Sequence, residues 1–123
     1  MNDFIEETFR IFKQKFNKGD YYSCHDFLEE IWMMDKQNYL IKGMLQMCVG
    51  LYHYSYGNIK GARMMLQSAH HYLTHTMETM DGVNVQEVCQ YIDQCLFIIP
   101  QTVELVPFEK IKSLPPLPSF LFP

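Results

Sequence analysis

Apolar residues recur at helical spacing along the first 99 residues of the chain. In the first segment Phe4, Phe12 and Phe16 fall four or eight positions apart, and near residue 90 Val88 and Ile92 repeat the same interval. This spacing gathers the apolar side chains on one face of a helix, and no run alternates in the way of a half-buried strand. The pattern predicts an all-α chain.

Four turn signals divide this region, and each offers Gly, Asn or Asp to end one helix and cap the next. These signals are Lys18-Gly19-Asp20, Asp35 to Asn38, Gly57-Asn58 and Asp81 to Asn84. They predict five helices, at about residues 3–16, 21–33, 39–56, 59–79 and 85–99. The helix at 39–56 is apolar on nearly all sides, as a buried central helix would be. We therefore expect a single compact bundle of about five helices around it.

The C-terminal part of the chain differs in composition from the rest. All six prolines lie between Pro100 and Pro123, so a helical bundle over residues 1–104 and a Pro-rich tail over 105–123 are expected. The tail is apolar around Leu114–Pro118 and Phe120–Phe122, too apolar for a free linker. It is expected to pack over the bundle, with docking on another subunit or a partner protein as the alternative.

Composition excludes several classes of function. The hydrophobic fraction of 48% argues against extensive disorder, and the formal charge of -4 argues against nucleic acid or anionic lipid as a partner. No apolar run is long enough to span a membrane, and the acidic N-terminal residues are unlike a signal peptide, so a cytoplasmic protein is expected. The cysteines form no Cys-x-x-Cys pair and are predicted to be reduced core thiols. They are Cys24, Cys48, Cys89 and Cys95.

Two helices carry polar residues that could form a site. His25, Glu29 and Trp32 share one narrow stripe of the predicted second helix, because they lie four and three positions apart. A His and a carboxylate placed in this way can bind one divalent cation or hydrogen-bond each other. On the third helix, small and polar residues form a seam at 3, 4, 3 and 4 spacing. The seam consists of Gly43, Gln46, Gly50, His53 and Gly57.

The seam has two expected consequences. Its glycines would permit close approach of a neighbouring backbone. Gln46 and His53 would need hydrogen-bond partners, and His25 and Glu29 on the preceding antiparallel helix are the expected ones.

These residues resemble a known family. His25-Asp26-Phe27-Leu28-Glu29-Glu30-Ile31-Trp32 matches the H-x-x-x-E-x-x-W motif of the bacterial and archaeal family known as domain of unknown function 309. Gly43 to Gln46, Leu51-Tyr52-His53, Gly57-Asn58 and Gly61-Ala62 are similar to its other motifs, in the same order. The resemblance covers roughly residues 8–75. It implies a small all-α fold of unknown activity, in which the His and Glu are suspected of binding metal.

Three interpretations of these polar residues remain open. They are a structural hydrogen-bond network, a site for Zn, Fe or Mn with His25, Glu29 and His53 as ligands, or a metal-free pocket for a small polar ligand. In the last two, Gln46 would orient a ligand and Trp32 would form an apolar wall. Asn58 is either a helix cap or a ligand contact.

Two functions follow from these interpretations. One is a small metal-dependent enzyme, such as a hydrolase. The other is a non-enzymatic interaction module that recognises a partner protein or a second copy of the chain. Residues 19–28 and 57–66 resemble each other weakly, as helical repeats do. His71, His75 and Glu78 form a second His-rich face, expected to be exposed and adventitious.

Overall fold

A computed structural model describes residues 3–123 and is all-α over that range, which confirms the predicted fold class. It contains five α-helices followed by a short 3-10 helix. These are α1 Asp3–Asn17, α2 Tyr21–Met34, α3 Tyr39–Ser55, α4 Ile59–His75, α5 Val85–Ile98 and η1 Phe108–Ser113. Within residues 3–123, no helix has the length and apolar character needed to cross a membrane.

Four of the helices begin at the caps that the turn signals predicted. The side-chain oxygen of each cap accepts a hydrogen bond from the backbone N–H three residues later, at distances of 3.0–3.2 Å. The caps are Asp20 for α2, Asn38 for α3, Asn58 for α4 and Asn84 for α5. Each satisfies one of the backbone donors that the first turn of a helix leaves free.

The predicted end of the fourth helix is wrong by four residues. The helix was expected to reach residue 79, but α4 ends at His75 and Thr76 is extended, with φ -83° and ψ 144°. The hydroxyl of Thr76 accepts the N–H of Glu78 at 3.1 Å, so the side chain replaces the helical hydrogen bond. The chain then turns back, and Met80 is buried in the core. Burial of Met80 in the core is thus favoured over continuation of α4 beyond His75.

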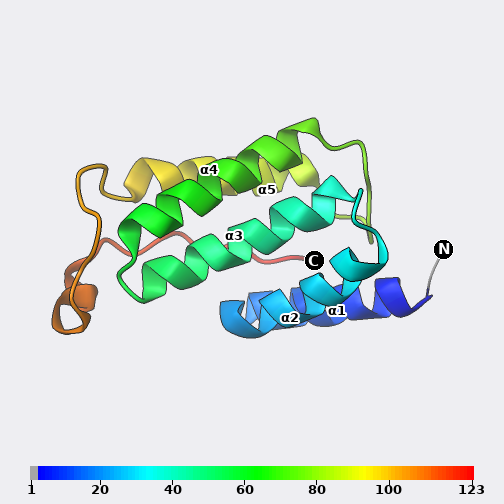
Figure 1. The fold of residues 1–123 in the computed structure, drawn as a ribbon, viewed down its shortest axis with the longest axis horizontal. Coiled ribbons are helices and arrows are strands. Elements are labelled where there is room, and N and C mark those ends of the chain that lie inside the picture. The colour runs from blue at the N-terminus through cyan, green and yellow to red at the C-terminus, as the bar shows by residue number, and fades with distance from the viewer. Residues whose placement is uncertain (1–2) are drawn as a thin grey trace.

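Helix α3 lies in the middle of the bundle, as predicted (Figure 1). It packs against α2 on one side and α4 on the other, while α1 covers α2 and α5 covers α4. The side chains that are fully buried come from all these helices. The largest are Phe9, Phe12, Phe16, Leu28, Ile31, Leu40, Ile41, Met44, Met47, Ile59, Leu66 and Leu73.

The glycine seam of α3 faces α4. A Cβ atom placed on Gly50 would lie 3.2 Å from the carbonyl oxygen of Ala62 and 3.0 Å from Cγ of Leu66. A Cβ atom on Gly43 would lie 2.6 Å from Cγ of Leu73. Glycine therefore lets the two backbones approach more closely than any other residue would, as the seam predicted.

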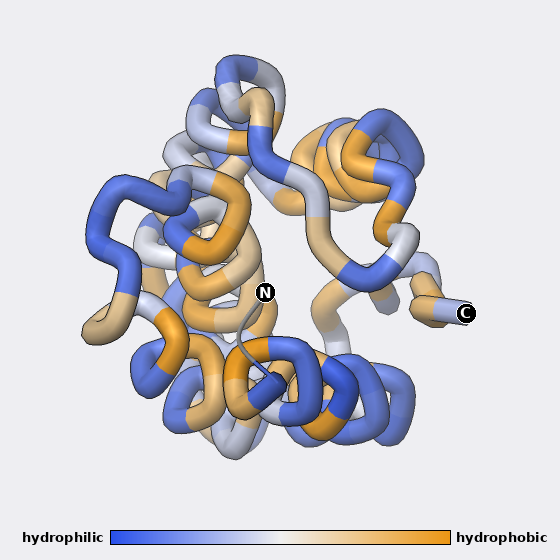
Figure 2. The backbone as a smooth tube through the Cα atoms, turned by 90° about the vertical axis from the view of Figure 1, so that its right-hand side faces the viewer, coloured by the Kyte–Doolittle hydropathy of each residue, from blue (hydrophilic) through white to orange (hydrophobic). Residues whose placement is uncertain are grey.

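The tail turns through η1 and then runs extended between α1 and α5 (Figure 2). The ring of Phe122 lies 5.4 Å from Phe12 and 5.0 Å from Phe16 on α1. The ring of Phe120 lies 5.4 Å from Tyr91 on α5. The amide of Asn17 both accepts the Phe122 N–H and donates to the Phe122 carbonyl, each at 2.8 Å. In this structure the tail thus packs on its own bundle, with aromatic contacts to both helices.

A cluster of thiols and tyrosines, of which Tyr21 is partly buried and the others are buried, joins α2, α3 and α5. Burial raises the pKa of the Cys95 thiol to about 11 and also raises the pKa of Cys48 and of Tyr91. The pKa of Tyr21 is raised by burial and by neighbouring thiols. These groups therefore stay neutral in the folded chain at a pH where they would ionise in the unfolded chain.

The protein should consequently lose stability in alkali. A pKa that is higher in the folded state favours the folded state only while the group is protonated, so this stability is complete below the ordinary thiol pKa of 9.0 and is lost as the pH rises through about 11. We expect the free energy of unfolding to fall by up to about 1.4 kcal/mol per pH unit for each such group. Urea unfolding under reducing conditions at increasing pH measures the slope. Cys95→Ala should make the slope shallower, and equal stability on both sides of this window would contradict the burial of the cluster.

Candidate functional site

His25 stands between two carboxylates on the outer face of α2. Its Nε2 lies 3.5 Å from Oε2 of Glu29, one helical turn further on, and its Nδ1 lies 3.9 Å from Oδ1 of Asp26. The predicted pairing of His25 with Glu29 is therefore present. Both side chains are partly exposed, His25 by 40% and Glu29 by 55%, so the pair borders solvent and is not a buried network.

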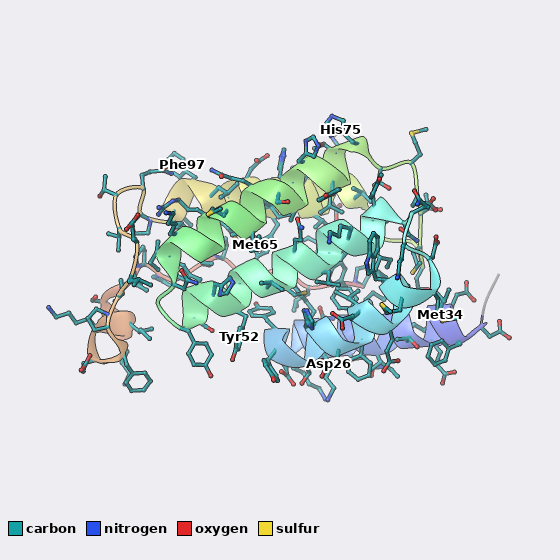
Figure 3. All side chains as sticks on the ribbon, viewed as in Figure 1. Asp26, Met34, Tyr52, Met65, His75 and Phe97 are labelled. Atoms are coloured by element: carbon teal, nitrogen blue, oxygen red, sulfur yellow. The ribbon has the colours of Figure 1, made fainter. Side chains whose placement is uncertain are left out.

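The cleft beside His25 is formed by α2 and α3 and has a volume of about 420 Å³. It is lined by Tyr21, Tyr22, His25, Asp26, Val49 and Tyr52. Asp26 and Tyr52 project from neighbouring helices on the same side of the molecule (Figure 3). The volume falls within the range of small-molecule sites, and the lining combines apolar walls with a few polar groups, as such sites do.

Tyr22 and Tyr52 line the cleft, and the ring of Tyr56 contacts that of Tyr52 beside it. The Tyr22 and Tyr52 ring centroids are 5.2 Å apart and the Tyr52 and Tyr56 centroids 4.7 Å apart, with the planes tilted by 46° and 59°. A hydrogen bond with Tyr56, reinforced by partial desolvation, raises the pKa of the Tyr52 hydroxyl to about 12. Tyr22 is 64% exposed and Tyr56 61% exposed, although a tyrosine of a folded protein usually buries more of its ring. The site thus presents two largely exposed aromatic side chains to solvent.

Trp32 lies near the opposite end of α2 and does not line this cleft. Its ring receives the ammonium group of Lys42 from α3, at 5.1 Å from the ring centroid. This is a cation–π contact between the two helices. Trp32 therefore contacts α3 outside the cleft, through Lys42.

Gln46 and His53 are not partnered by His25 and Glu29, contrary to the expectation from the seam. Nδ1 of His53 lies 3.4 Å from Nδ2 of Asn58. The buried Oε1 of Gln46 has no hydrogen-bond partner among residues 3–123. The glycines of the seam face α4, whereas the pair of His25 and Glu29 lies along α2. The spacing of residues within α3 could not indicate which neighbouring helix would face the seam.

Asn58 has the role of a helix cap. Its Oδ1 accepts the N–H of Gly61 at 3.0 Å, and its Nδ2 is within reach of His53. A Cβ atom on Gly61 would collide with the Asn58 side chain at 2.5–2.9 Å. Gly57 adopts φ +82° and lies directly against the carbonyl of Val106. The Gly-Asn and Gly-Ala stretches are thus accounted for by the turn between α3 and α4.

The donor set does not fit a single metal ion. The carboxylates of Asp26 and Glu29 face different nitrogens of the His25 ring, so they cannot converge on one ion together with the imidazole. His53 is oriented toward Asn58 instead. Within the described part of the chain, no three residues of the His, Cys, Asp and Glu types form a group able to hold a metal. We therefore derive no chemical step through a metal at His25, Glu29 and His53.

The second His-rich face lies at the end of α4. His71 and His75 are exposed, their ring centroids are 4.5 Å apart, and Nδ1 of His75 lies 2.7 Å from the His71 carbonyl oxygen. Glu78 follows the helix end and does not complete a metal-binding group there within residues 3–123. This face is exposed, as predicted.

The tyrosines are the site residues that the sequence reasoning missed. Tyr22 precedes His25 by three positions and Tyr52 precedes Tyr56 by four, so each pair shares a helix face. That spacing was a usable signal on each helix. It could not show that the two faces meet, because this depends on how α2 and α3 pack.

Part of this chain is similar to proteins that are already known. An uncharacterised protein of Aquifex aeolicus (strain VF5) is 25% identical over 83 residues, which cover 65% of this chain and 25% of that protein. The uncharacterised protein YpuF of Bacillus subtilis (strain 168) is 35% identical over 54 residues, which cover 41% of this chain and 30% of YpuF. The matched part of the chain thus spans about a quarter to a third of the length of these relatives.

No solved structure matches the chain significantly. The model of the family described as "Domain of unknown function (DUF309)" matches residues 9–65, which include α2, α3 and the turn into α4. This range contains His25, Glu29 and the glycine seam described above. Over residues 9–65, slightly less than half of its length, the chain is similar to the DUF309 family.

Proposed function

We propose that the chain binds a small molecule in the cleft between α2 and α3, with His25 held between Asp26 and Glu29 as its polar centre. One observation carries this proposal. The cleft joins an imidazole and a carboxylate to open tyrosine rings within about 420 Å³, which is enough space for a small ligand.

The contrast between the two halves of the family motifs supports this proposal. The glycines at positions 43, 50, 57 and 61 have packing or turn roles between α3 and α4, which need no ligand. His25 and Glu29 are partly exposed and pack no core, and an exposed ion pair contributes only about 0–1 kcal/mol to stability. Folding therefore explains the glycines, but it gives little reason for the His25–Glu29 pair. Binding of a ligand would give the pair a role.

Amide NMR spectra recorded with three small probes test the proposal. We would titrate phenol, acetate and tetramethylammonium separately into the protein. At least one probe should shift the signals of Tyr22, His25 and Tyr52 most strongly, because these residues line the cleft. His25→Ala should weaken these shifts and leave the melting temperature nearly unchanged, while His75→Ala, an exposed histidine on α4, should leave both unchanged.

Two results would contradict the proposal. One is that no probe shifts signals of the cleft, or that the shifts spread evenly over the surface. The other is that protein purified without an affinity tag contains near-stoichiometric Zn, Fe or Mn that disappears in both His25→Ala and Glu29→Ala. The second result would support the metal interpretation instead, and would require the side chains of the site to rearrange from the geometry described here.

A further inference from the structure

We infer that the ligand of the α2–α3 cleft is a small organic cation of the alkylammonium class, held on the tyrosine faces and beside the carboxylate of Asp26. This inference rests on the proposed function and specifies its ligand class. It depends on three features of α2 and α3, which are the exposed tyrosine rings, the charge of the side chains and an internal example of the same contact.

The tyrosine rings are the first feature. Tyr22 and Tyr56 expose most of their surface, and Tyr52 joins them into one cluster through ring contacts on both sides. The face of an aromatic ring is electron-rich and attracts cations, and cages of several such rings are the usual way that proteins hold quaternary ammonium groups. Within the described residues, no Lys or Arg occupies the faces of these three rings. The exposed rings of Tyr22 and Tyr56 therefore remain accessible to a cation from solution.

The charge at the cleft is the second feature. Asp26 lines the cleft with 77% of its side chain exposed, and Glu29 follows one turn later. Neither carboxylate has a Lys or Arg within ion-pair distance in the part of the chain that the structure describes, and His25 is the group that faces both. The whole chain also carries a formal charge of -4. The field at the cleft thus favours a cation over an anion.

The contact between Lys42 and Trp32 is the third feature. An ammonium group from α3 lies 5.1 Å from the centroid of an aromatic ring on α2, between the same two helices that form the cleft. The chain itself thus supplies the cation for this ring. At the cleft, tyrosine rings and a carboxylate are present without a Lys or Arg from the described residues, and an external alkylammonium group would complete the equivalent contact.

The test compares choline with the neutral alcohol in which a carbon atom replaces the choline nitrogen. The two probes have nearly the same shape and differ in charge. We expect choline to shift the amide signals of Tyr22 and Tyr52 and to bind about tenfold more tightly than the neutral alcohol, because a cation–π contact depends on the charge.

Matched variants separate the ring face from the hydroxyl group. Tyr22→Leu should weaken choline binding about tenfold, whereas Tyr22→Phe, which keeps the ring, should bind as the wild type does. Tyr22 is largely exposed, so neither change should unfold the protein. Asp26→Asn should also weaken binding. Tyr39→Leu serves as the control away from the site, because Tyr39 is an exposed tyrosine whose ring pairs with Tyr72 at 5.4 Å.

The outcomes distinguish this inference from the proposed function. Equal binding of choline and the neutral alcohol in the cleft would overturn the cation class and leave the ligand site standing. Binding of phenol or acetate in the cleft without choline would do the same. Shifts that Tyr39→Leu reduces as much as Tyr22→Leu would show general attraction to surface tyrosines and would overturn the inference. If none of the probes reached the cleft, both the inference and the proposed function would fail.

Discussion

Gly50→Leu is expected to lower the free energy of unfolding by about 3 kcal/mol or more. Overpacking in a filled interior typically costs about 1–3 kcal/mol, and here the added side chain meets backbone as well as side chains. The carbonyl oxygen of Ala62 and the Cβ atom of Met65 both lie 3.2 Å from the position of the new Cβ atom. Backbone cannot rotate away as the end of a side chain can, so α3 and α4 must move apart. Urea denaturation followed by circular dichroism measures the loss.

Two further variants complete this experiment. Gly50→Ala adds the Cβ atom alone and should show an intermediate loss. Val49→Leu adds one methylene group at the neighbouring position, which lines the open cleft between α2 and α3, and should change stability little. If Gly50→Leu were as stable as Val49→Leu, close packing of α3 on α4 through the seam would be refuted.

Phe122→Ala is expected to lower the free energy of unfolding by about 3 kcal/mol, the lower end of the usual cost of removing a buried phenylalanine ring. Phe122 is 4% exposed and contacts Phe12, Phe16 and Phe120. Its neighbour Leu121 is 66% exposed, so Leu121→Ala is the matched control and should cost much less. Truncation after Ser113 removes the whole segment and should lower the melting temperature further or cause aggregation.

Equal effects of Phe122→Ala and Leu121→Ala would contradict packing of the tail between α1 and α5. Sedimentation of the truncated protein adds an independent measurement. If truncation left the melting temperature unchanged but shifted the protein from a larger assembly to a monomer, the tail would bind another subunit instead of its own bundle.

Because residues 9–65 match the DUF309 family model, these experiments also bear on the roles of the residues in that matched region. The family description states no function, and the two relatives are uncharacterised. The glycine experiment concerns the α3–α4 half of the matched region, and the probe titrations concern the α2–α3 half. Together they separate residues that hold the fold from residues that contact a ligand.

Local signals predicted the helices well because the forces that start a helix are local. A cap such as Asn38 satisfies a backbone N–H three residues away, whatever the rest of the chain does. The pairing of His25 with Glu29 was predictable for the same reason, because helix geometry alone places residues four apart side by side. The end of α4 was not predictable in this way, since it depends on burying Met80 in a core formed by distant residues.

The sequence by itself determined that this chain is helical, where its helices begin, which residues share a helix face and that one face of α3 admits a close neighbour. Only the tertiary structure decided that this neighbour is α4, that Gln46 and His53 do not pair with His25 and Glu29, and that tyrosines of α2 and α3 meet in a cleft. It also decided that the tail lies between α1 and α5. The reason is physical: periodicity determines the direction of a side chain around its own helix, whereas contacts between helices depend on how all their faces pack together.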